Sequence, residues 1–446
     1  MSLTEDDKID PPSDHVESGY GNEKYEAQQE RDPFGDEEFA EVKYRTLQWW
    51  QAGLIMIAET VSLGILSLPS AMATLGLVPG IILLVGLGII ATYTAYVMGQ
   101  FKLRYPQVHN MADAGEILLG RVGREVFGAA QLIILIFVCG SHLLTWNIMM
   151  NTITDHGACT IVFGVCGMIV SIILALPRTL QKVSWLSILS FISIVTATLI
   201  TVITIGVQRP GNGHVDATTS PPFYVAFVSV TNIVFAFAGH VAFLGFISEM
   251  EKPKDFPKTV FLLQGVDVSL YVLAGVVIYR YGGENVTSPA LGSISPLMSK
   301  IAYGIAIPTI VIGGVVNGHV ACKYVYVRLF RGTTRMQERN LVSVGTWVAL
   351  VLAVWIIAWI IAESIPVFNN LLGLIAALFA SWFTYGLSGV FWLFMNWGQY
   401  FSSPKKIVLT LVNLTIFGIA GCICGVGLYV TGKAIHDSPV GTSWAC

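Results

Sequence analysis

The chain is dominated by apolar stretches that are each long enough to cross a lipid bilayer. A spanning helix needs about 20 mostly apolar residues, and the sequence contains eleven such stretches. Backbone N–H and C=O groups find no water in hydrocarbon, so only helices and closed barrels are stable there. We therefore expect an all-α integral membrane protein with eleven transmembrane helices. The expected spans are 47–70, 76–100, 126–150, 159–177, 185–207, 223–249, 259–281, 297–321, 342–362, 366–395 and 407–431.

Composition supports this fold class and suggests a division into three parts. Only 12% of the 446 residues are charged and 54% are hydrophobic, whereas soluble domains are about 25% charged. Residues 1–45 carry fourteen acidic and five basic residues, a composition typical of a disordered segment. We expect a cytosolic tail at 1–45, a transmembrane domain at 46–431 and a short extracytosolic tail at 432–446. The first tail is either a solvated spacer or a regulatory or trafficking segment.

The distribution of basic residues predicts the orientation. With a cytosolic N-terminus, 21 of the 25 lysines and arginines fall in cytosolic segments, as the positive-inside rule requires. Eleven spans then place the C-terminus outside. Cys159 and Cys446 both lie outside in this topology, so a disulfide between them is geometrically allowed, and Asn285 begins an exposed glycosylation sequon. In the cytosolic loop 102–125, residues Met111–Leu119 are expected to form a short amphipathic helix.

Two of the spans are interrupted by small residues near their middles. The first contains Glu59 to Pro69 with Ser62 and Gly64, and the sixth contains Ala238-Gly239. Backbone that leaves the helix at membrane depth is tolerated only where it is buried in protein or lines a cavity. Matching interrupted helices in two halves of a chain indicate the binding site of a secondary transporter. We expect the substrate to bind between the first and sixth spans.

Few ionisable residues lie at membrane depth, and each is a candidate for function because its burial is costly. Glu59 precedes the first break, where it either exchanges protons during transport or pairs structurally with another helix. His240 follows the second break, where it either titrates in coupling or donates a hydrogen bond to freed backbone. His142 and His319 are expected to be packing residues. Asp267 faces either a cavity or the cytosolic interface.

The breaks suit a zwitterionic substrate. Half-helix N-termini attract a carboxylate, and half-helix C-termini attract an ammonium group. Phe235, Phe237 and Phe243 supply an apolar wall, and Glu59 is the only fixed charge beside the breaks. A neutral amino acid fits this set best. Phosphate-binding, metalloprotease and hydrolase motifs are absent from the sequence, as is any nucleic-acid-binding pattern, so we expect a protein that is not an enzyme and holds no metal or cofactor.

Several motifs together resemble those of a known family. In their order and spacing, the chain is similar to the amino acid/auxin permease (AAAP) family, and within it to the fungal neutral amino acid permeases, over about residues 45–431. The motifs are Gly64-Ile-Leu-Ser-Leu-Pro69, Tyr105-Pro106, Ala112-Asp-Ala-Gly115, Gly120-Arg-Val-Gly-Arg124, Phe235-Ala-Phe-Ala-Gly-His240, Glu249-Met-Glu-Lys-Pro-Lys-Asp-Phe-Pro-Lys258, Ile365-Pro-Val-Phe368 and Gly373-Leu-Ile-Ala-Ala377.

The resemblance implies a fold like that of the bacterial leucine transporter, with a 5+5 inverted helix repeat plus one helix, and transport by alternating access. It also implies a cation site between the first break and the eighth span in sodium-coupled relatives. Here that part of the eighth span reads Gly313-Gly-Val-Val-Asn317, without the paired hydroxyls of such a site, which favours protons and leaves Asn317 as the candidate cation ligand. It further implies that the unwound stretches run from Ser62 to Leu66 in the first span and from Phe235 to Gly239 in the sixth. The substrate-binding residues it implies are Ser62, Leu63, Gly64, Ile65, Leu66, Phe235, Ala236, Phe237 and Gly239.

These observations predict a proton symporter that imports neutral aliphatic and aromatic amino acids across the plasma membrane, with Glu59 and His240 as proton-coupling candidates. Three alternatives remain: sodium coupling, a vacuolar location, and a sensor that binds amino acids without transporting them and signals through residues 1–45.

Overall fold

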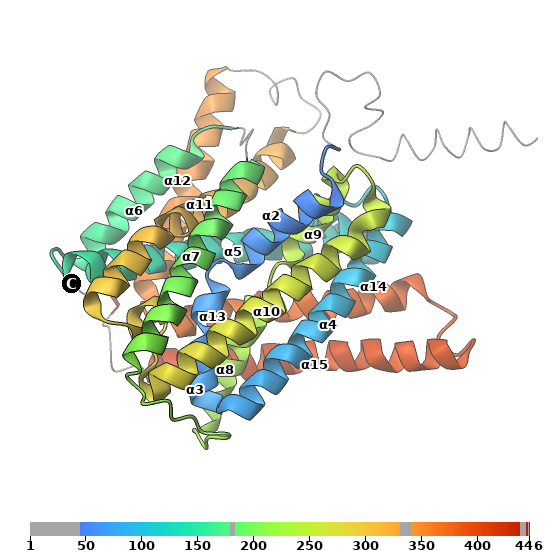
Figure 1. Cartoon of the computed structure of the whole chain (residues 1–446). Helices are drawn as coiled ribbons and strands as arrows, with labels where there is room; N and C mark the ends of the chain where they lie inside the picture. Colours follow the sequence, from blue (N-terminus) through green and yellow to red (C-terminus); the bar gives the residue numbers. More distant parts are fainter. Residues whose placement is uncertain (1–44, 179–182, 331–339, 438–442, 445) are drawn as a thin grey trace, which may run out of the picture.

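The protein is a bundle of long helices packed side by side (Figure 1). The computed structural model describes residues 45–178, 183–330, 340–437, 443–444 and 446. The predicted cytosolic tail therefore lies outside the described residues, apart from Arg45, as does much of the predicted C-terminal tail. Among the described residues, extended pairing is limited to one isolated bridge between Leu47 and Met250. The all-α prediction is confirmed.

Helix bounds agree with the expected spans to within a few residues, except where a helix extends into a segment that was expected to be a loop. The α-helices are α2 (Trp49–Val61), α3 (Leu68–Leu75), α4 (Leu77–Arg104), α5 (Met111–Thr154), α6 (Thr160–Ala175), α7 (Val183–Gln208), α8 (Phe223–Ala236), α9 (His240–Glu249), α10 (Phe256–Gly282), α11 (Pro296–Phe330), α12 (Leu341–Ser364), α13 (Phe368–Ile375), α14 (Leu387–Met395) and α15 (Pro404–His436). A 3-10 turn, η1 (Gly64–Leu66), joins α2 to α3, and a π-helical segment, η6 (Ala376–Gly386), joins α13 to α14.

The count of eleven spans is not confirmed. In the part of the chain that is described, nine helical stretches are long and apolar enough to cross a membrane, and the bent pair around η1 makes a tenth. The predicted span 159–177 corresponds to α6, which has only 16 residues. Its length falls below the roughly 20 residues that a straight crossing needs.

The outer surface of the bundle is apolar, as a lipid-facing surface must be. Ile82, Ile89 and Ile203 are each about two-thirds exposed, at 64%, 65% and 65%. The span formed by α13, η6 and α14 is 83% buried, whereas α12 and α15 are each 28% buried. The former therefore lies inside the bundle, while α12 and α15 lie on its flanks (Figure 1).

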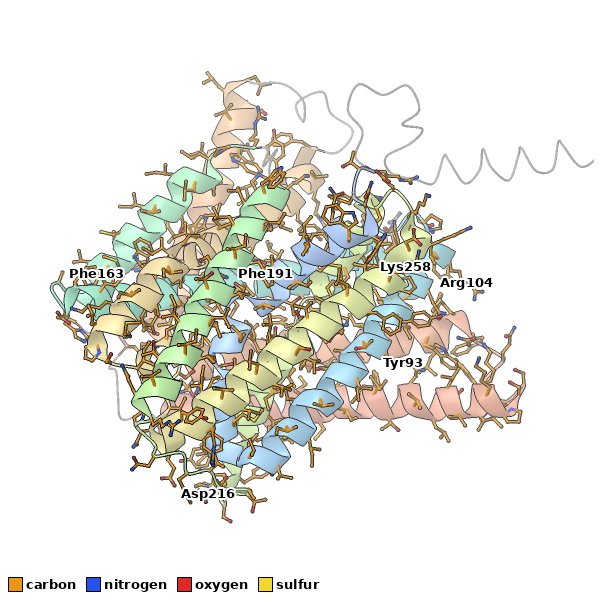
Figure 2. All side chains as sticks on the ribbon, in the orientation of Figure 1. Tyr93, Arg104, Phe163, Phe191, Asp216 and Lys258 are labelled. Carbon is orange, nitrogen blue, oxygen red and sulfur yellow. A yellow bond between two sulfur atoms is a disulfide. The ribbon has the colours of Figure 1, made fainter. Side chains whose placement is uncertain are left out.

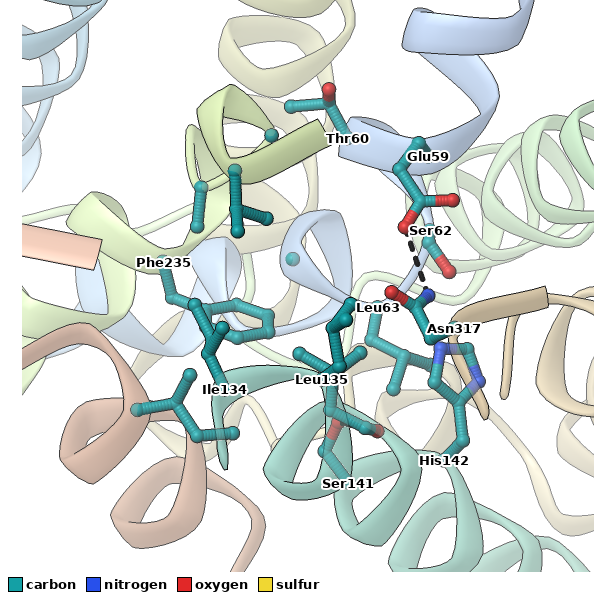
Figure 3. Close-up of a pocket in the computed structure, with 16 residues that line it drawn as sticks. Glu59, Thr60, Ser62, Leu63, Ile134, Leu135, Ser141, His142, Phe235 and Asn317 are labelled. Carbon is teal, nitrogen blue, oxygen red and sulfur yellow. Dashed lines mark hydrogen bonds between the residues drawn. The ribbon is translucent and has the colours of Figure 1, made fainter. Parts of the chain in front are cut away.

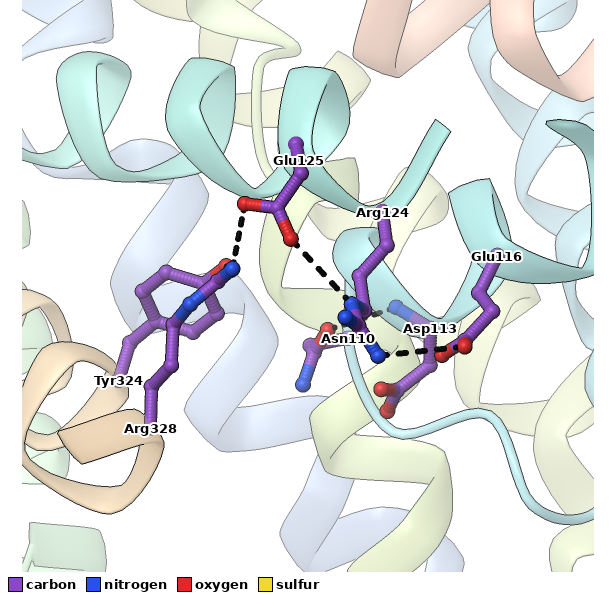
Figure 4. A network of polar contacts seen from close by, with 7 residues as sticks. All are labelled: Asn110, Asp113, Glu116, Arg124, Glu125, Tyr324 and Arg328. Atoms are coloured by element: carbon purple, nitrogen blue, oxygen red, sulfur yellow. Dashed lines mark hydrogen bonds and ion pairs between the residues drawn. The ribbon is translucent and has the colours of Figure 1, made fainter. Parts of the chain in front are cut away.

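Contacts at one end of the bundle join the segments that were predicted to be cytosolic. Leu47 exchanges backbone hydrogen bonds with Glu249 and Glu251, at 3.0 and 2.9 Å. Arg328 at the end of α11 pairs with Glu125 of α5, within a network that also includes Arg124 and Glu116 (Figure 4).

The opposite end joins the segments that were predicted to lie outside. Lys300 pairs with Asp155 at 2.5 Å, and a disulfide links Cys159 to Cys446. Figure 2 shows Arg104 and Lys258 at one end of the molecule and Asp216 at the other. The segments thus sort into the same two groups that the charge distribution predicted.

The expected amphipathic helix in loop 102–125 is present as the first part of α5. Gly120 breaks the helix with φ 63° and ψ −147°, a conformation that favours glycine because it has no β-carbon. The two arms fold closely together, since a β-carbon on Gly115 would lie 2.3 Å from the carbonyl oxygen of Gly123. This hairpin ends at the start of the third span.

Both predicted helix breaks are present. The first span leaves the α-helix at Ser62, with φ −11° and ψ −106°, continues as η1 and bends by 40°. It becomes helical again at α3, whose first turn contains Pro69, where a missing N–H is harmless. The sixth span is interrupted over residues 237–239. This break is narrower than expected, because Phe235 and Ala236 still belong to the last turn of α8.

Candidate functional site

The two broken spans touch each other at their breaks. A β-carbon on Gly64 would lie 2.7 Å from Cα of Ala236. Reciprocally, a β-carbon on Gly239 would lie 2.7 Å from Oγ1 of Thr60. Real β-carbons are essentially never this close to other heavy atoms, so the contact depends on glycine on each side. The interrupted segments, which are far apart in sequence, therefore form one structural unit.

A small cavity lies beside this contact (Figure 3). Its volume of about 50 Å³ is room for a few water molecules, at about 10–15 Å³ each by the same measure. Helices α2, α5, α8, α9, α11 and α13 and both breaks contribute to its wall. Its lining residues are Glu59, Thr60, Ser62, Leu63, Gly64, Ile134, Leu135, Val138, Ser141, His142, Phe235, Ala238, Gly239, Val241, Asn317 and Ile375.

Glu59 and Asn317 meet on one wall of the cavity. The Asn317 amide donates to Oε1 of Glu59 at 2.8 Å and to the carbonyl oxygen of Gly313 at 2.9 Å. The second bond fixes the amide on α11, so Asn317 presents its N–H groups to the carboxyl group in a fixed orientation. The proton-coupling candidate of the first span and the cation candidate of the eighth are thus direct partners.

Ser62 and His142 lie next to this pair. The Ser62 hydroxyl is buried and has no hydrogen-bond partner among the described residues. His142 Nδ1 lies 2.9 Å from the carbonyl oxygen of Ile310, so in a neutral ring Nδ1 carries the proton and Nε2 is an acceptor. A β-carbon on Gly313 would lie 3.0 Å from His142 Nε2 and 3.2 Å from Ser62 Oγ. The three residues therefore converge at this end of the cavity.

The substrate-binding prediction divides into two groups. Those that line the cavity are Ser62, Leu63, Gly64, Phe235 and Gly239. Those that do not are Ile65, Leu66, Ala236 and Phe237, all of which are buried in the surrounding core. The second group packs around the breaks outside the cavity, and Ala236 contacts Gly64.

His240 also lies outside the cavity lining. Its side chain is fully buried, and its Nε2 atom lies 3.1 Å from both the Ala91 carbonyl oxygen and the Thr94 hydroxyl of α4. The ring packs against Phe243, with centroids 4.5 Å apart and the ring planes tilted by 32°. His240 therefore fastens the start of α9 to α4.

The third span also contributes to the cavity wall, which was not predicted. Ile134, Leu135, Val138, Ser141 and His142 all line the cavity, and their spacing places them on one face of α5. The adjacent polar pair Ser141-His142 within an apolar span was the available signal. His142, expected to be a packing residue, is in fact part of the wall.

The other intramembrane ionisable residues do not line the cavity. Asp267 of α10 is fully buried, and its carboxyl oxygens have no hydrogen-bond partner among the described residues. The ring of His319 packs against Trp347, with centroids 5.1 Å apart. Glu59 is thus the single carboxylate of the cavity wall, which also has no lysine or arginine among the described residues.

Histidine, cysteine, aspartate and glutamate side chains form no group suited to a metal ion within the described ranges. The cavity instead offers one carboxyl group, one imidazole, hydroxyl groups and helix ends, a set that suits hydrogen bonding to a small polar molecule.

Similarity to a known protein family also indicates a transporter. The family model described as "Transmembrane amino acid transporter protein" matches residues 45–431. The chain belongs to the AAAP family. It is an amino acid transporter and not an enzyme, and it is a multi-pass membrane protein.

Individual relatives agree with this family assignment. The N amino acid transport system protein of Neurospora crassa is 37% identical over 89% of this chain and 86% of its own length. A transmembrane transporter of Gibberella moniliformis is 32% identical over 79% of this chain and 76% of its own. Amino acid transporter AVT1H of Arabidopsis thaliana is 25% identical over 85% and 88%.

Similarity to solved structures shows that this AAAP transporter has the leucine-transporter fold. MhsT in complex with L-phenylalanine matches with a TM-score of 0.52 and 14% identity, covering 85% of this chain and 98% of that one. Mhp1, a nucleobase-cation-symport-1 family transporter, matches with a TM-score of 0.53 and 13% identity over 90% and 96%. The predicted leucine-transporter-like fold is therefore confirmed, whereas the predicted count of eleven helices is not.

Proposed function

We propose that this AAAP transporter imports neutral amino acids by proton symport, with the substrate held between the two helix breaks. The observation that carries the proposal is the Glu59–Asn317 pair on the cavity wall. A carboxyl group can bind and release a proton, and Glu59 is the single carboxylate of the described cavity wall. Its position beside the break lets protonation change the wall that the substrate contacts.

The lining favours a neutral substrate. A second fixed charge on the amino acid would need a partner of opposite sign. The described cavity wall has no lysine or arginine for an anionic side chain, and its one carboxylate, Glu59, is assigned here to the coupled proton. Backbone groups at the breaks suit the zwitterionic head, while Phe235, Leu135 and Ile375 suit an apolar side chain. The proposed substrates are therefore aliphatic and aromatic amino acids.

The proposed location is the plasma membrane, with residues 1–45 in the cytosol and residues 432–446 outside. The basic residues support this orientation through the positive-inside rule. The sequon residue Asn285 is exposed and belongs to a segment assigned to the outside. The bilayer, protons and amino acids are the partners that this function requires.

The test is uptake of radiolabelled leucine and phenylalanine into proteoliposomes under an inward proton gradient or an inward sodium gradient. Accumulation driven by protons alone is the expected result. Accumulation that needs sodium would indicate that a cation near Asn317, and not a proton on Glu59, is coupled to transport. Binding without uptake under either gradient would favour the sensor function.

A further inference from the structure

The hydroxyl group of Tyr271 lies between the ends of the two broken helices. This residue of α10 is fully buried. Its hydroxyl oxygen is 2.7 Å from the carbonyl oxygen of Ala236 and 3.0 Å from that of Thr60. Thr60 belongs to the last turn of α2, and Ala236 is the last residue of α8. One phenol therefore contacts the C-terminal end of each half-helix.

These two carbonyl groups need a donor. The last four carbonyls of a helix have no partner within it, and a helix C-terminus carries a partial negative charge. Here two such ends converge at membrane depth, where an unpaired polar group has no water to bind and is costly. Water or a cation could in principle bind such carbonyl groups, but in this protein the Tyr271 hydroxyl already donates to them.

The Tyr271 side chain is positioned by a continuous helix, α10. Helix α10 is unbroken from Phe256 to Gly282 and packs along α2, α3 and α4. The Tyr271 ring also packs edge-on against Phe237 of the second break, with centroids 5.4 Å apart. A continuous helix thus fixes the position of one donor that serves two interrupted helices.

We propose that Tyr271 is a positioning residue for transport, whose hydroxyl holds the ends of α2 and α8 at the separation that the substrate site requires. Tyr271 does not line the cavity, so it acts through the backbone of the two breaks and does not contact the substrate. This inference rests on the proposed substrate site between the breaks.

The test compares wild type with Tyr271→Phe in the full-length protein, reconstituted in proteoliposomes. Losing one buried hydrogen bond is worth about a tenfold change in affinity. We expect the KM for leucine uptake to rise about tenfold by that measure, with a smaller change in maximal rate. A KM within twofold of wild type would overturn the proposal.

Two further variants separate donation from packing. Tyr385 is fully buried and its hydroxyl has no hydrogen-bond partner among the described residues, so Tyr385→Phe should leave the KM unchanged. Tyr271→p-aminophenylalanine keeps a donor at the same place and should retain the wild-type KM. This second variant also tests the proposal if Tyr271→Phe fails to fold, because a raised KM despite the retained donor would overturn it.

Gly64→Ala in the same assay distinguishes this inference from the proposed function. If Gly64→Ala changes the KM and Tyr271→Phe does not, the substrate site stands and the role of Tyr271 is wrong. If neither substitution changes the KM in a folded protein, the site between the breaks is itself wrong.

Discussion

Gly64 and Ala236 are in contact at the point where the two broken helices cross. A β-carbon at Gly64 would lie 2.7 Å from Cα of Ala236 and 3.2 Å from its Cβ. The nearest atom belongs to the backbone, so a larger side chain cannot be accommodated by rotating a neighbour. The two breaks must separate or shift to admit even one methyl group.

Gly64→Ala is therefore expected to reduce leucine uptake at least tenfold, because the added methyl group forces the breaks apart. Small-to-large changes in packed sites typically cost about 1–3 kcal/mol. Initial uptake rates in proteoliposomes measure the effect. Gly86→Ala is the matched control, since a β-carbon there meets nothing within 4 Å. Equal loss in both variants would contradict a specific role for the crossing.

Glu59→Gln is expected to abolish acid-driven accumulation while sparing exchange of labelled for unlabelled leucine. The amide keeps the shape of the carboxyl group but cannot bind and release a proton. Accumulation under an inward proton gradient and counterflow without a gradient are the two measurements. Wild-type accumulation in this variant would rule out Glu59 as the coupling residue.

Glu363→Gln provides a close control for that experiment. Glu363 is also a buried carboxylate that accepts a hydrogen bond from an asparagine, Asn147, at 3.0 Å. It lies at the end of α12, away from the cavity. We expect acid-driven accumulation to survive this change, so that loss of coupling in Glu59→Gln reflects the cavity and not the removal of any buried charge.

His142→Phe is expected to weaken apparent leucine affinity severalfold, because the ring lines the cavity and its Nδ1 atom contacts the Ile310 carbonyl oxygen. One polar contact in a membrane site is worth about 0.5–2 kcal/mol. Substrate-dependent thermal stabilisation gives the affinity without requiring flux. An unchanged affinity in a stable variant would return His142 to the packing role expected from sequence.

His240→Phe is expected to lower thermal stability but to leave acid-driven accumulation in place. The substitution removes the contacts of Nε2 with Ala91 and Thr94, at a cost of about 0.5–2 kcal/mol. The melting temperature should therefore fall, whereas the pH dependence of uptake should remain that of the wild type. Loss of the acid drive in a folded variant would instead establish His240 as a coupling residue.

The Cys159–Cys446 disulfide allows the proposed membrane orientation of the chain to be tested by thiol labelling. On intact cells, a membrane-impermeant maleimide should label the protein only after an impermeant reductant has been added from outside. Labelling should disappear when both residues are changed to serine, which controls for the free cysteines Cys166, Cys422 and Cys424. Labelling that requires permeabilised cells would contradict a plasma-membrane protein with its C-terminus outside.

Patterns within one segment were enough to predict much of this architecture. Apolar length identified the spans, and small residues such as Gly64 and Gly239 marked the breaks, because both properties are local to the chain. The predicted limits of the second break were less accurate. Phe235 and Ala236 remain helical, since the packing of neighbouring helices decides how far a helix continues before it opens.

The composition of the cavity wall could not be predicted in this way. Glu59 and Asn317 are separated by 258 positions, and nothing in either segment reveals that the two side chains meet. In the sequence, His240 beside the second break was a proton-coupling candidate, whereas His142 was expected to be a packing residue. Their different surroundings, one on the cavity wall and one against α4, depend on how the helices rotate about their axes.

The sequence by itself determined the membrane-spanning helical fold, the two breaks and the grouping of segments at the two ends, because hydrophobic length, glycine and charge act locally. Only the tertiary structure decided which side chains face the cavity and that Tyr271 serves both broken helices. Those relationships arise from packing between distant helices, where a contact depends on the position of both partners and neither sequence segment specifies it alone.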